Sequence, residues 1–178
     1  MSYQTKTINE LTENEIDIIL KLWDISEWKD MKTDYFRSFF KNSEFHFLFE
    51  SNTICGILRL NLDFELEISE KEYHFFEAVG LVSAEKKKGY GKKLIHYFKE
   101  NIKKRNLEVI GFCDAELRNF YEKCDIEILY NQAKIIKEKA GTEWVNSEDD
   151  DILIFNLSEE KIIVLNQLPE NKTYLKEK

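Results

Sequence analysis

The chain has 178 residues, enough for one globular domain with a single core. Hydrophobic residues make up 43% of it and aromatic residues 13%, so the composition excludes a disordered chain. The net charge of −8 argues against nucleic acid as a partner, because binding phosphates requires a basic surface. Residues 1–8 are polar, and no run approaches the roughly 18 apolar residues that span a bilayer. We therefore expect a cytoplasmic protein without a membrane partner.

The three cysteines predict neither a disulfide framework nor a metal site. Cys55, Cys113 and Cys124 are odd in number and show no C-x-x-C spacing. Their neighbours are apolar, so we expect buried thiols and no bound metal.

Two helices are predicted near the N-terminus. Thr12 and Glu15 form a capping-box pattern, and apolar residues then recur on one helix face. We expect Thr33 to cap a second, aromatic-rich helix. The apolar residues of the two helices are Ile16, Ile19, Leu20 and Trp23, and Tyr35, Phe36, Phe39 and Phe40.

Strands and helices alternate through the rest of the chain. Aromatic and β-branched residues at 45–49 and 53–60 flank a short polar connection at 50–52, which predicts a β-hairpin. Residues 73–82 predict a strand, 89–105 an amphipathic helix and 107–112 another strand. We expect Asp114 to cap a short helix that runs to Lys123, and residues 151–157 to form a late strand.

This order predicts a mixed α/β sheet in one domain over residues 1–178. We expect its core at residues 3–157. Residues 158–178 are expected to form a polar extension, loosely held after Pro169.

Positive charge is concentrated in one segment. Residues 86–105 contain nine Lys or Arg and one acid, a net charge of +8, so the rest of the chain carries −16. In this segment a strand passes through a turn with Gly89 and Gly91 into a helix. The first amides of a helix lack intrahelical partners and lie at the positive end of its dipole. The turn therefore predicts a diphosphate site.

Two other phosphate-binding motifs do not fit this turn. A Walker loop needs a glycine where Lys86 stands and Ser or Thr where Lys93 stands. A dinucleotide fingerprint needs a glycine where Leu94 stands.

The segment Lys86-Lys-Lys-Gly-Tyr-Gly91 resembles the acyl-CoA motif Q/R-x-x-G-x-G/A of the GNAT N-acetyltransferase superfamily. Lysine at its first position keeps the positive charge but loses the guanidinium fork. Further along, Asn119-Phe-Tyr-Glu-Lys-Cys-Asp-Ile126 resembles a later motif of the same family, with Asp125 and Ile126 in place of the usual Gly and Phe.

The resemblance implies a GNAT fold, with a twisted mixed sheet of about six to seven strands flanked by helices. It implies that the sheet splays between strands 73–82 and 107–112. Acetyl-CoA would be the acyl donor, with its pantetheine arm in the gap and paired with backbone groups of Leu81 and Val82. Its pyrophosphate would contact the amides of Lys86, Lys87, Lys88, Gly89, Tyr90, Gly91 and Lys92.

The resemblance also implies two groups for proton transfer. Tyr121 occupies the tyrosine position of the later motif and would donate a proton to the CoA thiolate. Glu77 lies on the strand where many relatives carry a general base. The alternatives are a core tyrosine for Tyr121 and a salt bridge on the strand face for Glu77.

Several other polar residues are weaker candidates. His46, His74 and His96 are expected to be structural or solvated. The acidic run Glu148–Asp151 is expected to be a solvated loop or to border the acceptor site. The order of Gly111-Phe-Cys, the Asn119 segment and this run is similar in layout to aminoglycoside 2′-N-acetyltransferase-like members.

The implied reaction is direct transfer of an acetyl group to a primary amine. We expect a small cationic acceptor, because acids and aromatic residues cluster at Trp23–Asp30 and at Trp144 with the acidic run. The alternatives are another acyl group, a hydroxyl acceptor, or a regulatory CoA-binding module without catalysis. We expect a monomer or a homodimer.

Overall fold

Residues 1–176, which the computed structural model describes, form two compact units, each with buried hydrophobic residues. The N-terminal unit consists of Met1–Leu62 and Ala78–Phe98, and the C-terminal unit of Asp63–Glu77 and the chain from Lys99 onward. Strand β3 (Thr53–Ile68), strand β4 (Lys71–Ser83) and helix α3 (Tyr90–Lys104) contribute residues to both units.

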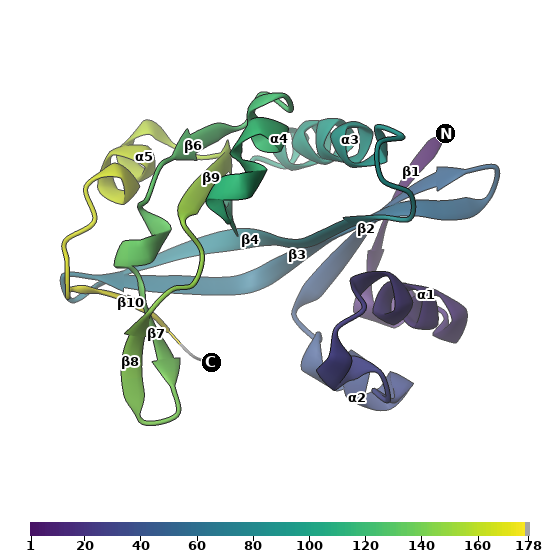
Figure 1. Ribbon diagram of the computed structural model, residues 1–178, viewed down its shortest axis with the longest axis horizontal. Coiled ribbons are helices and arrows are strands. Elements are labelled where there is room, and N and C mark those ends of the chain that lie inside the picture. Colours follow the sequence, from purple (N-terminus) through teal and green to yellow (C-terminus); the bar gives the residue numbers. More distant parts are fainter. Residues whose placement is uncertain (177–178) are drawn as a thin grey trace. The chain divides into compact units, whose positions relative to one another are not determined.

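The N-terminal unit combines antiparallel strands with two helices (Figure 1). β1 (Ser2–Thr7) pairs with β2 (Ser43–Glu50), and β2 pairs with β3. Ser51 and Asn52 connect β2 to β3 with φ of 48° and 66°, the left-handed backbone of a two-residue type I′ turn. The predicted hairpin is therefore confirmed.

Helix α1 (Glu13–Trp23) begins where the capping box predicted. The Glu15 amide donates to Thr12 Oγ1, and the Thr12 amide donates to the Glu15 carboxylate. Helix α2 (Thr33–Phe39) is capped by Lys32 without a side-chain bond, so the prediction that Thr33 is the cap was wrong by one residue. Both helices bury their apolar faces with β2, in a core that includes Ile16, Ile19, Phe36, Phe45 and Phe47.

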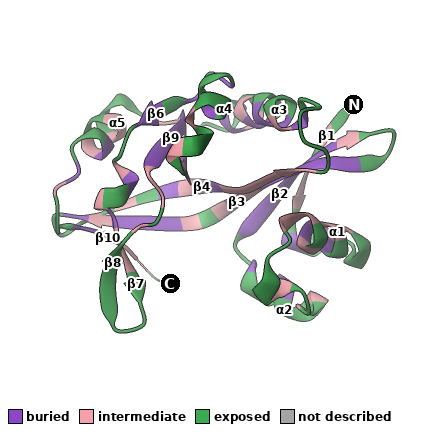
Figure 2. Cartoon of the chain, in the orientation of Figure 1, coloured by how far each residue is buried: buried purple, intermediate pink, exposed green. Residues whose placement is uncertain are grey.

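The C-terminal unit has the strand order β6-β9-β5-β4-β3-β10-β7-β8. β5 and β6 run antiparallel to β9, whereas β10 runs parallel to β7, so the sheet is mixed. Figure 2 shows that β9 is largely buried and that β8 is exposed. These strands are β5 (Val109–Cys113), β6 (Glu127–Leu129), β7 (Lys137–Ala140), β8 (Glu143–Asn146), β9 (Asp151–Asn156) and β10 (Thr173–Leu175).

The described chain contains ten strands, more than the six to seven expected. Four of them, β6, β7, β8 and β10, have only three or four residues each. Such short segments show no recognisable alternation in the sequence. The mixed α/β class is confirmed, and the splay between β4 and β5 stays a prediction.

Short helices connect the strands of the C-terminal unit. They are α4 (Arg118–Glu122), α5 (Glu159–Asn166) and the 3-10 turns Ala115–Leu117 and Ala133–Ile135. Asp114 precedes the first turn, but its side chain makes no cap bond. The Ala115 amide donates instead to Asp150 Oδ2 at 2.6 Å, so the capping carboxylate comes from another segment. None of the helices in residues 1–176 is long and apolar enough to cross a membrane.

The expected polar, loosely held extension is wrong for its described part. Leu165 and Leu168 are buried in the core of the C-terminal unit. β10 pairs antiparallel with β3, and Thr173 is fully buried in that ladder. The apolar residues of α5 need a core to cover them, and β10 satisfies an otherwise open edge of β3.

Candidate functional site

The predicted CoA-binding turn follows β4 in the N-terminal unit. Lys87 and Gly89 have positive φ, 64° and 76°, which gives the turn a left-handed backbone at two positions. The first hydrogen bond of helix α3 runs from the Lys93 amide to the Gly89 carbonyl at 3.1 Å. The amides that precede Lys93 therefore have no intrahelical partner, as at any helix N-terminus.

The surface of this turn is open and basic. A Cβ built on Gly89 meets no atom within 4 Å, so a ligand could approach the backbone closely. The side chains of Lys86, Lys87, Lys88 and Lys92 are all exposed. Lys88 makes only an exposed ion pair with Glu85 at 3.7 Å, which contributes little. The turn thus fits an anionic group of the size of a diphosphate.

Tyr90 differs from the other predicted ligand-binding residues because its side chain is buried. Its hydroxyl donates to Glu50 Oε2 at 2.6 Å and so anchors the start of α3 to the end of β2. This hydrogen bond, with burial, raises the pKa of Tyr90 to about 12. Only the backbone of Tyr90 is available to a ligand. Gly91 is half-buried.

A glycine that the sequence reasoning missed shapes β4 immediately before Leu81 and Val82. Gly80 has φ of 68°, and a positive φ inside a strand is typical of a β-bulge. Its carbonyl accepts a hydrogen bond from Trp23 Nε1 at 2.8 Å. A Cβ there would lie 2.9 Å from that nitrogen, so no other residue fits without rearrangement. An isolated glycine within an apolar strand was the available signal.

The other two predicted site residues belong to the C-terminal unit. Tyr121 lies on α4 and is 8% exposed, with its ring against Phe120 at a centroid distance of 5.0 Å. No residue of the described chain hydrogen-bonds its hydroxyl. Burial, followed by the neighbouring Cys113 and Cys124, raises the pKa of Tyr121 well above its usual value. All three cysteines are buried, as predicted.

Asp149 is a further candidate for the site beside Tyr121 and Glu77. The sequence did not single it out. Burial is the main cause that raises its pKa to about 6, and the nearby carboxylates of Asp114, Glu138 and Glu77 add to it. The carboxylate of Asp149 in turn raises the pKa of Tyr121. Asp149 therefore interacts electrostatically with both predicted catalytic side chains, Glu77 and Tyr121.

The expectation that the acidic run is solvated was wrong for its last residues. Asp151 is fully buried and accepts two hydrogen bonds from Arg118, at 2.5 and 2.8 Å. Asp150 pairs with Lys134 at 2.5 Å. These partners neutralise the two carboxylates and leave Asp149 as the member of the three whose pKa is raised.

The three histidines have different surroundings. His46 is fully buried between Tyr3 and Glu44, which confirms a structural role. His96 is exposed beside Tyr97 on α3. His74 is exposed and contacts Glu65.

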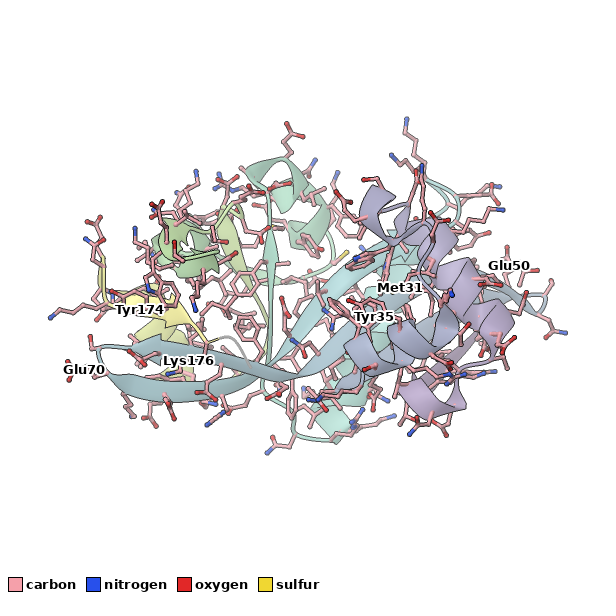
Figure 3. All side chains as sticks on the ribbon, turned by 90° about the horizontal axis from the view of Figure 1, so that it is seen from below. Met31, Tyr35, Glu50, Glu70, Tyr174 and Lys176 are labelled. Atoms are coloured by element: carbon pink, nitrogen blue, oxygen red, sulfur yellow. The ribbon has the colours of Figure 1, made fainter. Side chains whose placement is uncertain are left out.

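One of the two predicted acceptor clusters borders a groove in the N-terminal unit. The groove has a volume of about 510 Å³ and is lined by Glu27, Trp28, Asp30, Met31, Lys32, Tyr35 and Phe39. Figure 3 labels Met31 and Tyr35 beside each other on this unit. Trp23 does not line the groove, because it packs against the core. Its ring centroid lies 5.7 Å from that of Trp28.

The other predicted acceptor cluster combines Trp144 with the acidic run. Trp144 is exposed at the β7–β8 hairpin. Its ring packs edge-on against that of Tyr174, with a distance of 4.9 Å between the ring centroids.

A mixed α/β sheet with a basic glycine turn at a helix start fits an anionic ligand such as a diphosphate. Residues 9–126 match the sequence profile of the Acetyltransferase (GNAT) family. The match covers more than half of the chain, and the chain belongs to this family.

Solved structures show the same fold at low sequence identity. An acyl-CoA N-acyltransferase from Pseudomonas aeruginosa is 14% identical, with a TM-score of 0.53 over 86% of this chain and 97% of that one. The catalytic domain of the Tetrahymena histone acetyltransferase GCN5, in complex with coenzyme A, is 18% identical, with a TM-score of 0.53 over 87% and 93%. An aminoglycoside acetyltransferase from an uncultured soil metagenomic sample is 19% identical, with a TM-score of 0.51 over 69% and 86%. No curated protein matches this sequence.

Asp149→Asn is expected to stabilise the protein at pH 8 and to have little effect near pH 4.5. A carboxyl whose pKa is raised binds more protons in the folded state than in the unfolded state. The free energy of unfolding therefore falls as pH rises from about 4 towards 6, and above that range the ionised Asp149 carries a stability penalty. Asparagine removes this penalty, which partial exposure reduces to about 1 kcal/mol. Urea unfolding at both pH values measures the difference. Asp150→Asn, which removes a paired carboxylate, should destabilise at pH 8, and equal effects of the two variants would contradict the assignment.

Proposed function

We propose that the protein transfers an acetyl group from acetyl-CoA directly to the primary amine of a small cationic acceptor. The observation that carries this proposal is the open glycine turn at the start of α3, with exposed lysines around it. The Tetrahymena relative with the same fold is a complex with coenzyme A, which supports a CoA donor.

The residues present fit such a donor. The amides of residues 86–92 would hold the pyrophosphate, and Lys86, Lys87, Lys88 and Lys92 would add positive charge. The backbone of Leu81 and Val82, directly after the Gly80 bulge, would pair with the pantetheine amides. A positive φ at Gly80 is typical of a bulge, which would interrupt the ladder of β4 and make backbone groups available to a ligand.

Tyr121 is the proposed acid. Its raised pKa keeps the hydroxyl protonated at physiological pH, and no residue of the described chain forms a hydrogen bond with it. A phenol with so high a pKa is a weak proton donor to a thiolate, whose conjugate acid has a pKa of roughly 8.5. Its contribution is therefore a hydrogen bond that stabilises the negative charge on the leaving sulfur.

Glu77 is the proposed base, and Asp149 is a second candidate that the structure adds. A base must be ionised and near the acceptor amine, and a pKa of about 6 suits Asp149 to accept a proton near neutral pH. The pH dependence of kcat/KM distinguishes the two. Asp149→Asn should remove a limb near pH 6 if Asp149 is the base and leave that limb unchanged if Glu77 is.

The groove beside α2 is the proposed acceptor site. Its lining carries the carboxylates of Glu27 and Asp30 against one ammonium, that of Lys32, so its local charge favours a cation. The exposed ring faces of Tyr35 and Phe39 can contact a cation directly. Within the N-terminal unit, Trp28 connects this groove through Trp23 to the Gly80 carbonyl of β4.

A cationic acceptor predicts a salt-dependent KM. Polyamines, aminoglycosides, amino acids and a lysine peptide should be compared by release of the CoA thiol at about 0.05 M and about 0.5 M salt. We expect cationic amines to be preferred and their KM to rise several-fold at high salt, because screening weakens the attraction. Asp30→Asn should reduce this salt effect, whereas Asp17→Asn on α1 should not. Preference for a neutral or anionic acceptor would reject the acceptor class and leave the acyltransferase proposal in place.

Two alternatives remain distinguishable by the same assay. Another acyl donor would show faster release from propionyl-CoA or longer thioesters. A CoA-binding module without catalysis would bind acetyl-CoA and release no thiol with any acceptor.

A further inference from the structure

We propose that Glu65, Glu72 and His74 form a binding site for a divalent transition-metal ion. One ligand atom from each of the three side chains lies within 4.8 Å of the other two. His74 Nδ1 is already 3.0 Å from Glu65 Oε2. This site goes beyond the proposed acyl transfer, whose proton donor and base require no metal.

Strand geometry explains why the three side chains converge. Glu72 and His74 are two residues apart on β4, so their side chains point to the same face of the sheet. Glu65 lies on β3, the neighbouring strand in the C-terminal unit. The sequence analysis missed the site because its residues come from two strands, and cysteine spacing gave no indication of it.

Only one of the three side chains, that of Glu65, is buried. The Glu65 side chain is 7% exposed, whereas that of His74 is 69% exposed. A buried carboxylate requires a compensating charge or hydrogen bond. His74 is one such partner of Glu65. A metal held between Glu65 and the exposed side chains of Glu72 and His74 would keep its remaining coordination positions open to water.

The donor set selects the kind of ion. One imidazole nitrogen and two carboxylates suit Zn²⁺, Co²⁺ or Mn²⁺, with water completing the coordination. Ca²⁺ and Mg²⁺ prefer sets made only of oxygen. We therefore expect Zn²⁺ to bind more tightly than Ca²⁺.

Lys176 would compete with a metal for the carboxylate of Glu72. Its ammonium lies 3.1 Å from Glu67 and 3.7 Å from Glu72, and Figure 3 labels it on the C-terminal unit. Glu67 is the nearer partner, so Glu72 can turn to a metal while Lys176 keeps one ion pair. Removal of this ammonium should strengthen metal binding.

The test is calorimetric titration of Zn²⁺ into the full chain after treatment with a chelator. We expect one ion per chain, binding at least about tenfold weaker in His74→Ala and Glu72→Gln, and tighter binding in Lys176→Ala. Both weakened variants change exposed side chains, and circular dichroism would verify that they fold.

His96→Ala is the matched control, because the third histidine, His46, is fully buried and cannot reach solvent. It should leave Zn²⁺ affinity unchanged. NMR of the histidine rings should show Zn²⁺ shifting the His74 signals first. Absence of binding, binding that survives His74→Ala, or binding lost only in His96→Ala would each overturn the proposal.

Discussion

Gly89→Asp is expected to abolish the binding of acetyl-CoA. Gly89 lies at the start of α3, where the space above its Cα is empty and the backbone has φ of 76°. An aspartate there places a side chain and a negative charge where the pyrophosphate is proposed to bind. Calorimetric titration of acetyl-CoA into the wild type and the variant measures the loss directly.

Two control variants separate charge from shape. Gly89→Asn introduces a side chain of the same size without charge, and asparagine tolerates positive φ about as well as aspartate. It should weaken binding less than Gly89→Asp. Gly141→Asp, in the β7–β8 turn, changes another glycine with positive φ and open surroundings and should leave binding intact. Unchanged affinity in Gly89→Asp would refute the assignment of the turn.

Tyr121→Phe is expected to lower kcat by about 10²-fold or more while the affinity for acetyl-CoA stays nearly the same. The ring of Tyr121 remains to fill its buried position, and only the hydroxyl that stabilises the leaving sulfur is lost. Because no residue of the described chain bonds that hydroxyl, the variant should keep its stability. Steady-state thiol release and urea unfolding measure the two quantities.

Tyr97→Phe provides the control for this variant. Tyr97 is 39% exposed on α3, so loss of its hydroxyl should change neither kcat nor stability. Full activity in Tyr121→Phe would assign Tyr121 to the core alone. A large loss of stability would instead show that the hydroxyl has a structural role.

Local sequence signals predicted the local features of this fold. The Thr12 capping box set the start of α1, and Ser51-Asn52 between two apolar runs gave the β2–β3 hairpin. The lysine and glycine pattern at residues 86–91 predicted an exposed basic turn before a helix. Each of these depends on neighbours within a few residues, which the sequence displays directly.

Features that depend on distant partners could not be predicted in this way. Asp114 occupies the predicted cap position, yet the carboxylate that accepts a hydrogen bond from the Ala115 amide is that of Asp150. The pKa of Asp149 is set by burial and by carboxylates on other segments. The side chain of Tyr90 is held by Glu50, forty residues earlier, and no local pattern indicated this hydrogen bond.

The most direct test of the central claim is the rate at which free CoA thiol is released from acetyl-CoA as the concentration of an amine acceptor increases. An acetyltransferase predicts saturable, amine-dependent release that Gly89→Asp and Tyr121→Phe both reduce. Tight binding of acetyl-CoA without release for any amine, or release unaffected by both substitutions, would contradict the proposed function.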